Sequence, residues 1–410
     1  MSEYHLNYPS IIFLVGGVIL LVMLIKPGLE RLGVPALVGF LVLGFLIRLA
    51  DTRFDLFTAG YRQIFTFMAN IGLITLLFRV GLESNIRGLA GQLRRAGIVW
   101  FGNVFISGPV GFFTAWGLLG FHWVTSLIVA TAFTATSVGI TVAVWKEAEV
   151  LDTPQGQLLV DVAEMDDISA VVLMAILFAI IPTLRSGTAA SLFPLVSGTL
   201  GLFLLKLLAF GAFCFLFSQY VERHVVHFFG NLESRPDLML VVVAIGFVIA
   251  ALAGALGFSL AIGAFFAGLV FSRDPETLKM ESSFLPLYSL FSPFFFIGIG
   301  MDLDPAVLGT TLGIGGILLV MAVLGKFIAN ALPLFFMTGV STAVLIGFSM
   351  VPRAEIAMVI MQRGLDLGDW AVPGDAYAAM VVVSAATCIL SPLLLRWLLK
   401  RQFPEGEKKG

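Results

Sequence analysis

Four carboxylates lie inside one long apolar stretch, in the segment DVAEMDDISAVVLM (161–174). In a helix Asp161, Glu164 and Asp167 share one face, whereas Asp166 is turned about 100° away from its neighbour. This spacing suits one carboxylate that faces water and another that is paired inside the protein. A structural ion pair accounts for one such acid, but not for a ladder of four. We therefore interpret the ladder as a path for cations or protons, with Asp161 and Glu164 as accessory acids.

A single lysine offers the matching positive charge. Lys326 lies in VLGKFIANALP, in the body of another apolar run. A charge near the bilayer centre costs about 2.5–3.5 kcal/mol on insertion scales, so it needs a partner or a purpose. Asp166 is the natural partner, because a neighbouring carboxylate keeps a desolvated ammonium in its charged form. A cation that binds the carboxylate would compete with the lysine, which makes the pair a switch.

Two further apolar runs are interrupted at their centres. TATSVGIT (134–141) places hydroxyls and a glycine in one of them, and FSMVPRAEIA (348–357) places Pro352 in the other. Proline removes a backbone donor, so an unwound segment is expected there. Interrupted helices in corresponding positions of two halves indicate inverted repeats with an ion site at the membrane midplane. If the repeats are the second to sixth and the ninth to thirteenth spans, each interrupted helix is the fourth of five.

Polar side chains accompany both interruptions. Thr136 and Ser137 offer oxygen ligands that we expect beside Asp167, although ordinary hydroxyl bonding to the helix backbone is an equally simple explanation for them alone. Two unwound segments that cross bring the dipole ends of half-helices together. Arg353 and Glu355 would neutralise those ends.

The composition identifies the element that must position these residues. The chain has 410 residues, of which 59% are hydrophobic and 12% charged, and its mean hydropathy is +1.01. A soluble protein would carry about a quarter charged residues. Runs of about twenty apolar residues cross a bilayer as helices, since lipid leaves no partner for stray backbone groups. The sequence predicts an all-α polytopic membrane protein with about thirteen spans: 9–25, 35–50, 64–82, 97–119, 124–145, 157–181, 191–221, 237–254, 259–272, 284–301, 311–335, 340–362 and 374–399.

The distribution of basic residues sets the expected orientation. One alternating set of loops, together with the C-terminal tail, holds most of them: Lys26, Arg31, Arg87, Arg94, Arg95, Lys146, Arg223, Arg235, Arg273, Lys279, Arg396, Lys400, Arg401, Lys408 and Lys409. The positive-inside rule then places the N-terminus outside and the C-terminus in the cytoplasm. The first span lacks a basic leader, so we expect it to be retained.

Other sequence features bear on cysteine chemistry, on further domains and on the remaining cations inside the spans. Cys214 and Cys388 both lie in apolar runs, where we expect them to be small residues buried in helix packing. Two such cysteines support neither a disulfide framework nor a cysteine metal site. No loop is long enough for a soluble domain, so we expect no nucleotide-binding domain, no nucleic-acid partner and no cofactor. Lys206 would reach the interface along its own stem, and Arg79 would either do the same or pair with Glu164.

In order along the chain, TATSVGIT, the Asp166-Asp167 pair, Lys326 and PRAEIA resemble the monovalent cation:proton antiporter-2 family, especially its electrogenic bacterial sodium/proton antiporters. The resemblance covers essentially the whole chain and implies inverted five-helix repeats with two crossing discontinuous helices. It also implies a division into parts, with boundaries as follows: dimerisation helices in 1–96 and 237–305, a core transport domain in 97–181 and 306–400, a linker helix in 182–236 and a cytoplasmic tail in 401–410.

The resemblance further implies a role for single residues. Asp167 would be the principal cation and proton carrier, Asp166 would pair with the coupling lysine Lys326, Thr136 and Ser137 would line the cation site, and Arg353 and Glu355 would serve the helix crossover. Na⁺ would therefore bind among Asp167, Asp166, Ser137 and Thr136. The chain departs from the family in one place, since Ala354 stands where glycine is common, which would stiffen the second break.

The expected function is transport rather than catalysis. The resemblance implies exchange of cytoplasmic Na⁺ (or Li⁺) for external H⁺ by an elevator-like movement, in a homodimer within the lipid of a bacterial inner membrane. A K⁺/H⁺ antiporter of the same family is the first alternative, because oxygen ligands hardly separate these ions. Potassium-efflux relatives usually have glutamine and aspartate at the acidic pair and a nucleotide-binding domain. We find neither feature in this sequence, which favours sodium/proton exchange over gated potassium efflux. From other classes, a cation channel and a non-transporting membrane sensor stay open.

Overall fold

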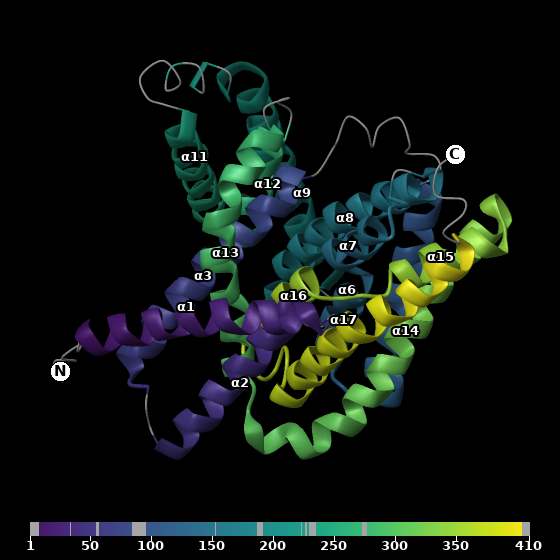
Figure 1. Ribbon diagram of the computed structural model, residues 1–410, viewed down its shortest axis with the longest axis horizontal. Helices are drawn as coiled ribbons and strands as arrows, with labels where there is room; N and C mark the ends of the chain where they lie inside the picture. Colours follow the sequence, from purple (N-terminus) through teal and green to yellow (C-terminus); the bar gives the residue numbers. More distant parts are fainter. Residues whose placement is uncertain are drawn as a thin grey trace. The chain divides into compact units, whose positions relative to one another are not determined.

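The computed structural model describes residues 8–32, 34–54, 57–83, 96–151, 153–186, 192–222, 224–225, 228, 235–272 and 277–403. Within these residues every regular element is a helix (Figure 1). The end of the predicted cytoplasmic tail, 404–410, lies outside them, as do several of the basic residues that set the expected orientation, such as those of 84–95.

The helices follow the predicted spans closely. Their bounds are α1 Tyr8–Arg31, α2 Ala36–Phe54, α3 Ala59–Glu83, η1 Asn103–Ser107, α5 Gly108–Phe113, η2 Thr114–Leu118, α6 Trp123–Thr134, α7 Val138–Glu147, α8 Pro154–Ser186, α9 Leu192–Leu216, η3 Phe217–Val221, α11 Arg235–Ala255, α12 Leu260–Phe271, α13 Thr277–Met301, η4 Pro305–Val307, α14 Leu308–Thr338, α15 Val340–Ser349, α16 Glu355–Asp366 and α17 Gly374–Gln402. Each predicted span coincides with one of these helices or with a consecutive group of them. In the described part of the chain, 9 helical segments are long and apolar enough to cross a membrane, and one of them, Trp123–Glu147, includes the break between α6 and α7.

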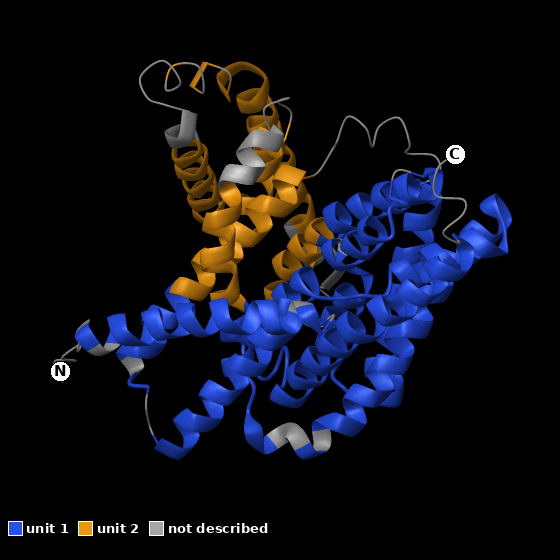
Figure 2. Ribbon diagram, in the orientation of Figure 1, with its two compact units in different colours: residues 1–67, 87–170, 296–410 blue, residues 68–86, 171–295 orange. Residues whose placement is uncertain are grey.

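The chain forms two compact units (Figure 2). Unit 1 consists of residues 1–67, 87–170 and 296–410, and unit 2 of residues 68–86 and 171–295. All the residues that the sequence analysis selected for ion binding, from Thr136 to Glu355, belong to unit 1. The assignment of individual helices to a dimerisation domain and a core domain stays a prediction.

Unit 1 contains a very close helix contact. A methyl group placed on Gly44 of α2 would overlap the carbonyl oxygen of Ile297 on α13. The contact is mutual, because a methyl group on Gly300 would overlap the carbonyl oxygen of Leu41. Small residues allow backbones to approach in membranes, where no hydrophobic force between helices operates.

Both interrupted helices that the sequence predicts are present. α6 ends at Thr134 and α7 begins at Val138, while α15 ends at Ser349 and α16 begins at Glu355. The two breaks meet directly, because the main-chain N–H of Ser137 donates a hydrogen bond of 2.7 Å to the carbonyl oxygen of Pro352. A half-helix that ends inside a membrane is stable only when its freed backbone groups find partners within the protein.

The span predicted for 97–119 is helical but irregular. It contains two π-helical turns, Asn103–Ser107 and Thr114–Leu118, on either side of α5. Such turns are rare and are found frequently at functional sites, since they shift the side chains that follow onto a new face. Here the first turn brings Asn103 and Ser107 inward, where both are fully buried.

Candidate functional site

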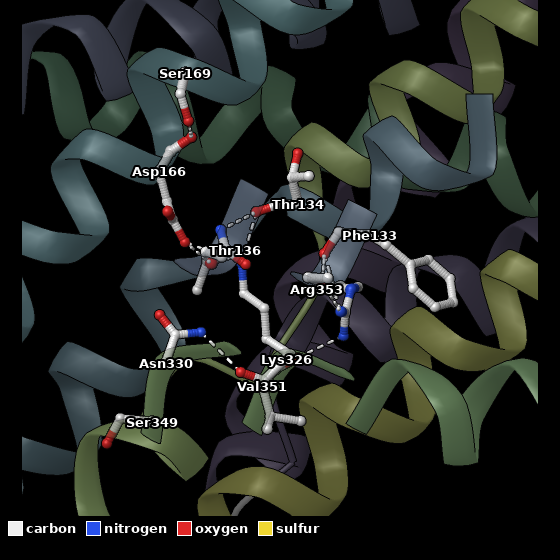
Figure 3. A network of polar contacts seen from close by, with 12 residues as sticks. Phe133, Thr134, Thr136, Asp166, Ser169, Lys326, Asn330, Ser349, Val351 and Arg353 are labelled. Atoms are coloured by element: carbon white, nitrogen blue, oxygen red, sulfur yellow. Dashed lines mark hydrogen bonds and ion pairs between the residues drawn. The ribbon is translucent and has the colours of Figure 1, made fainter. Parts of the chain in front are cut away.

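The end of α6 is where the polar groups gather. A helix terminus leaves its last carbonyls without partners in the helix and carries a partial negative charge. Two cations from other elements bind these carbonyls. Lys326 of α14 donates to the carbonyl oxygen of Thr134 at 2.6 Å, and Arg353 donates through Nη2 to that of Phe133 at 3.0 Å (Figure 3).

Lys326 also forms a buried ion pair. Its Nζ lies 2.9 Å from Oδ2 of Asp166, and both side chains are 0% exposed. The same carboxylate oxygen accepts a hydrogen bond of 2.8 Å from the hydroxyl of Thr136. Removing two charges from water is expensive, and their attraction offsets the cost only when additional hydrogen bonds satisfy them. The hydroxyl of Thr136 and the carbonyl of Thr134 supply such bonds.

Arg353 fills the space between the breaks. It is fully buried and donates to the carbonyl oxygens of Ala322 at 3.1 Å and Val351 at 3.2 Å, besides that of Phe133. Its guanidinium carbon lies 4.9 Å from the centre of the Phe133 ring, an arrangement in which the ring face attracts the cation. The planar fork of arginine spreads five N–H donors over several carbonyls, whereas a lysine presents three from a single atom.

The four carboxylates of α8 divide as their spacing predicts. Asp166 is completely buried, whereas Asp161, Glu164 and Asp167 are each partly exposed. The adjacent pair therefore combines one residue that is closed off with Lys326 and one that is partly exposed. Such an arrangement can hold a positive ion at the exposed member while the buried member exchanges its own partner.

The two hydroxyls of the first break have different partners. Thr136 donates to Asp166, and Ser137 donates to Oε2 of Glu355 at 3.0 Å. The reason lies in the backbone: the N–H of Ser137 is held by the second break, and its side chain accordingly points to α16, which begins with Glu355. Glu355 thus joins the crossover, as its position beside Pro352 predicts. The expected role of both hydroxyls at a cation site beside Asp167 stays a prediction.

Some buried polar residues of the site were missed by the sequence reasoning. Asn103 donates through Nδ2 to the carbonyl oxygen of Thr134 at 2.9 Å, and Ser107 donates to that of Phe133 at 2.8 Å. Asn330 donates to the carbonyl oxygen of Lys326 at 2.8 Å. A signal existed for Asn330, which follows Lys326 by one helical turn and so shares its face.

Comparison with known proteins assigns the chain to a family. The family model described as "Sodium/hydrogen exchanger, transmembrane" matches residues 17–401. The chain belongs to this family. Among curated relatives, this exchanger is 28% identical to a high-affinity Na⁺/H⁺ antiporter, NhaS3, from Synechocystis, over 99% of the chain and 86% of the relative. It is 26% identical to a Na⁺/H⁺ antiporter of Enterococcus hirae (91% and 94% covered) and 26% identical to the Na⁺/H⁺-K⁺ antiporter GerN of Bacillus cereus (90% of each).

A solved structure shares the fold of this exchanger. The sodium proton antiporter MjNhaP1 from Methanocaldococcus jannaschii superposes with a TM-score of 0.71 over 97% of the chain and 99% of that protein, at 15% sequence identity. The likeness supports the all-helical membrane fold with discontinuous helices that the sequence predicts. Membership of the family also agrees with the expected resemblance to monovalent cation:proton antiporters.

A second polar cluster lies at the end of α16. Gln362 donates through Nε2 to Asp302, directly after α13, at 2.9 Å, and to Asp366 at 3.4 Å. Its amide oxygen accepts a hydrogen bond from the hydroxyl of Tyr377 on α17. One amide therefore links two carboxylates that both carry negative charge when ionised.

Asp302 should give this exchanger an acid-dependent stability. Burial of its carboxyl raises the pKa from the usual 3.8 to about 6; the Gln362 hydrogen bond opposes the rise, Asp366 adds to it, and Arg48 and Arg62 oppose it. Between about pH 4 and 6 the folded protein thus holds a proton that the unfolded chain releases, so stability falls as the pH rises through this window. We expect the melting temperature in detergent to fall less across this window for Asp302→Asn than for the wild type. Parallel curves would contradict the assignment.

Proposed function

We propose that this protein is a secondary active transporter that exchanges cytoplasmic Na⁺ (or Li⁺) for external H⁺. The observation that carries the proposal is the fully buried Asp166–Lys326 pair, placed beside the partly exposed Asp167 where two broken helices cross. A titratable group inside a membrane marks an ion or proton pathway by default. Several relatives are Na⁺/H⁺ antiporters, which supports the same proposal.

In the proposed cycle, Asp167 is the residue that meets the cation. Its ionised carboxylate binds Na⁺ from the water-exposed side, and Asp166 and Thr136 add oxygen ligands from the buried side. Hard cations prefer such ligands. Ser137, which bonds Glu355, contributes only after that bond opens. A proton on Asp167 removes the charge that holds Na⁺, so the two ions occupy the site alternately, and this competition couples their movements.

Lys326 is the residue through which the proposed cycle moves net charge across the membrane. Na⁺ at the acidic pair competes with the ammonium for Asp166, so that cation binding loosens the ion pair and lets a proton leave. Two protons for each Na⁺ make the cycle electrogenic. The membrane potential then contributes about 2.3 kcal/mol per charge per 100 mV to the exchange. Arg353 and Glu355 hold the crossover while the ions change places.

The finer architecture belongs to the same proposal. We expect a homodimer in a bacterial inner membrane, with the N-terminus outside and the C-terminus in the cytoplasm. The parts 97–181 and 306–400 form the moving core, and 1–96 and 237–305 the dimer scaffold. The core moves as an elevator, carrying its bound ion across. No substrate bond is made or broken, so the protein acts as a transporter and not as an enzyme.

An ion panel in proteoliposomes tests the proposal. Acidic vesicles that contain the protein and a pH-sensitive dye receive Na⁺, Li⁺ or K⁺ from outside, and protein-free vesicles serve as the control. We expect rapid alkalinisation with Na⁺ and Li⁺. Alkalinisation with K⁺ alone would replace the proposal by K⁺/H⁺ exchange, the first alternative, which the relative GerN, a Na⁺/H⁺-K⁺ antiporter, also suggests. No ion-dependent proton movement would refute both.

A further inference from the structure

Two buried amides beside the ion pair each have an unused oxygen. Asn103 and Asn330 are both 0% exposed, and in the described part of the chain neither Oδ1 has a hydrogen-bond partner. Their orientation is not arbitrary, because each amide nitrogen donates to a main-chain carbonyl, that of Thr134 for Asn103 and that of Lys326 for Asn330. An unsatisfied buried acceptor costs free energy, so its retention needs an explanation.

Both amides lie around Lys326. The ammonium of Lys326 and Nδ2 of Asn103 donate to the same oxygen, that of Thr134, at 2.6 and 2.9 Å. Asn330 follows Lys326 by one turn of α14 and appears beside it and below Asp166 in Figure 3. The contact between the two elements is close, because a methyl group on Gly102 would come within 2.6 Å of the carbonyl oxygen of Ala329. Asn103 directly follows Gly102, and Asn330 directly follows Ala329, so both amides lie next to this close contact.

The free oxygens require a donor, and cation binding at the acidic pair would release one from the Asp166–Lys326 ion pair. Lys326 uses two of its three N–H groups on Asp166 and Thr134. When a cation occupies the acidic pair, as the proposed function requires, the ammonium must leave Asp166 without access to water, since Lys326 is 0% exposed. A buried ammonium without its counter-ion readily gives up a proton, and the amine that is left still needs acceptors for the N–H groups it keeps.

We propose that Asn103 and Asn330 form the receiving site for the Lys326 side chain when a cation displaces it from Asp166. Thr134 bonds the lysine in both positions, so the ammonium turns about that carbonyl and does not travel freely. In the ion-free state neither amide oxygen accepts a hydrogen bond, and in the loaded state both accept from the N–H groups that Lys326 keeps after its proton has left. They are positioning residues, because they act on the transported ion only through Lys326.

Isosteric changes at Asn330 test the inference. Asn330→Leu removes the acceptor, and its loss should raise the KM for Na⁺ about tenfold, equivalent to about 1.4 kcal/mol, with the maximal rate within about twofold of the wild type. Asn330→Asp keeps an acceptor of the same shape and adds charge. It should therefore bring the KM to the wild-type value or below it, because it draws Lys326 away from Asp166.

A matched control comes from the same helix. The hydroxyl of Thr338 on α14 donates to the carbonyl oxygen of Leu334 at 2.9 Å, so Thr338→Val loses one side-chain bond to the backbone, as Asn330→Leu does, without touching Lys326. Its KM should be unchanged, and both variants should show similar melting temperatures without Na⁺. If Asn330→Leu keeps the wild-type KM, or if the Leu and Asp variants share one KM, the receiving site is refuted although exchange stands. If the wild type shows no Na⁺-dependent proton movement, the proposed function itself fails.

Discussion

Asp167→Asn will reduce Na⁺-driven proton movement to the level of protein-free vesicles. Asparagine has the shape of aspartate but neither ionises nor takes up a proton, so the site loses both the charge that binds Na⁺ and the carrier for H⁺. We expect a loss of about a hundredfold or more, the effect of about 2.7 kcal/mol on a binding constant. The measurement is the rate of dye-reported alkalinisation after a Na⁺ pulse, at matched protein density.

The control for this result is an acid outside the site. Glu147 at the end of α7 lies 3.0 Å from Arg396 in an exposed ion pair, and such pairs contribute little to stability. Glu147→Gln should transport at the wild-type rate. The melting temperature of each variant is measured in parallel, so that a loss of exchange is separated from a loss of folded protein. Exchange at the wild-type rate in Asp167→Asn would remove this residue from the mechanism.

Lys326→Gln is expected to change both stability and charge movement. It leaves Asp166 buried with Thr136 but without its ammonium partner, and breaking a buried pair by removing one member costs about 3–5 kcal/mol. The melting temperature in detergent should fall accordingly. In vesicles, an imposed membrane potential should no longer accelerate exchange, because the variant carries one proton fewer in each cycle.

A double variant separates the two effects of this change. Asp166→Asn combined with Lys326→Gln removes both buried charges, so it should recover most of the stability that the single variant loses. It should still lack the response to membrane potential. A single Lys326→Gln variant with wild-type stability and an unchanged potential response would show that the pair neither stabilises the fold nor couples charge.

Much of the fold was predictable because lipid restricts the solutions. Apolar runs long enough to span a membrane predicted the helices. The two breaks were predicted by the hydroxyl-rich segment at 134–141 and by Pro352, since few residues can end a helix inside a membrane. The irregularity of 96–118 was not predictable. Its π turns, which begin at Asn103 and Thr114, follow from how neighbouring helices pack and leave no periodic mark in the sequence.

The charged residues of the site were predictable, because a charge buried in hydrocarbon needs a partner of opposite sign. Asp166 and Lys326 are isolated opposite charges in hydrocarbon, and the structure brings them to 2.9 Å. Neutral polar groups have many possible partners, and their choice depends on distances between helices. For this reason the bond from Ser137 to Glu355 and the buried amide of Asn103 were not foreseen. The ion-carrying roles of all these residues stay predictions.

The bond between Ser137 and Pro352 has a mechanical consequence. Two extended segments that meet usually exchange hydrogen bonds in both directions, as neighbouring strands do. Proline has no N–H to return, so among the described residues the two breaks share a single main-chain bond. Side chains therefore carry the rest of the junction, since Ser137 donates to Glu355 and Thr141 donates to the carbonyl oxygen of Ser349. Replacing either hydroxyl would remove a link between the half-helices that the main chain does not duplicate.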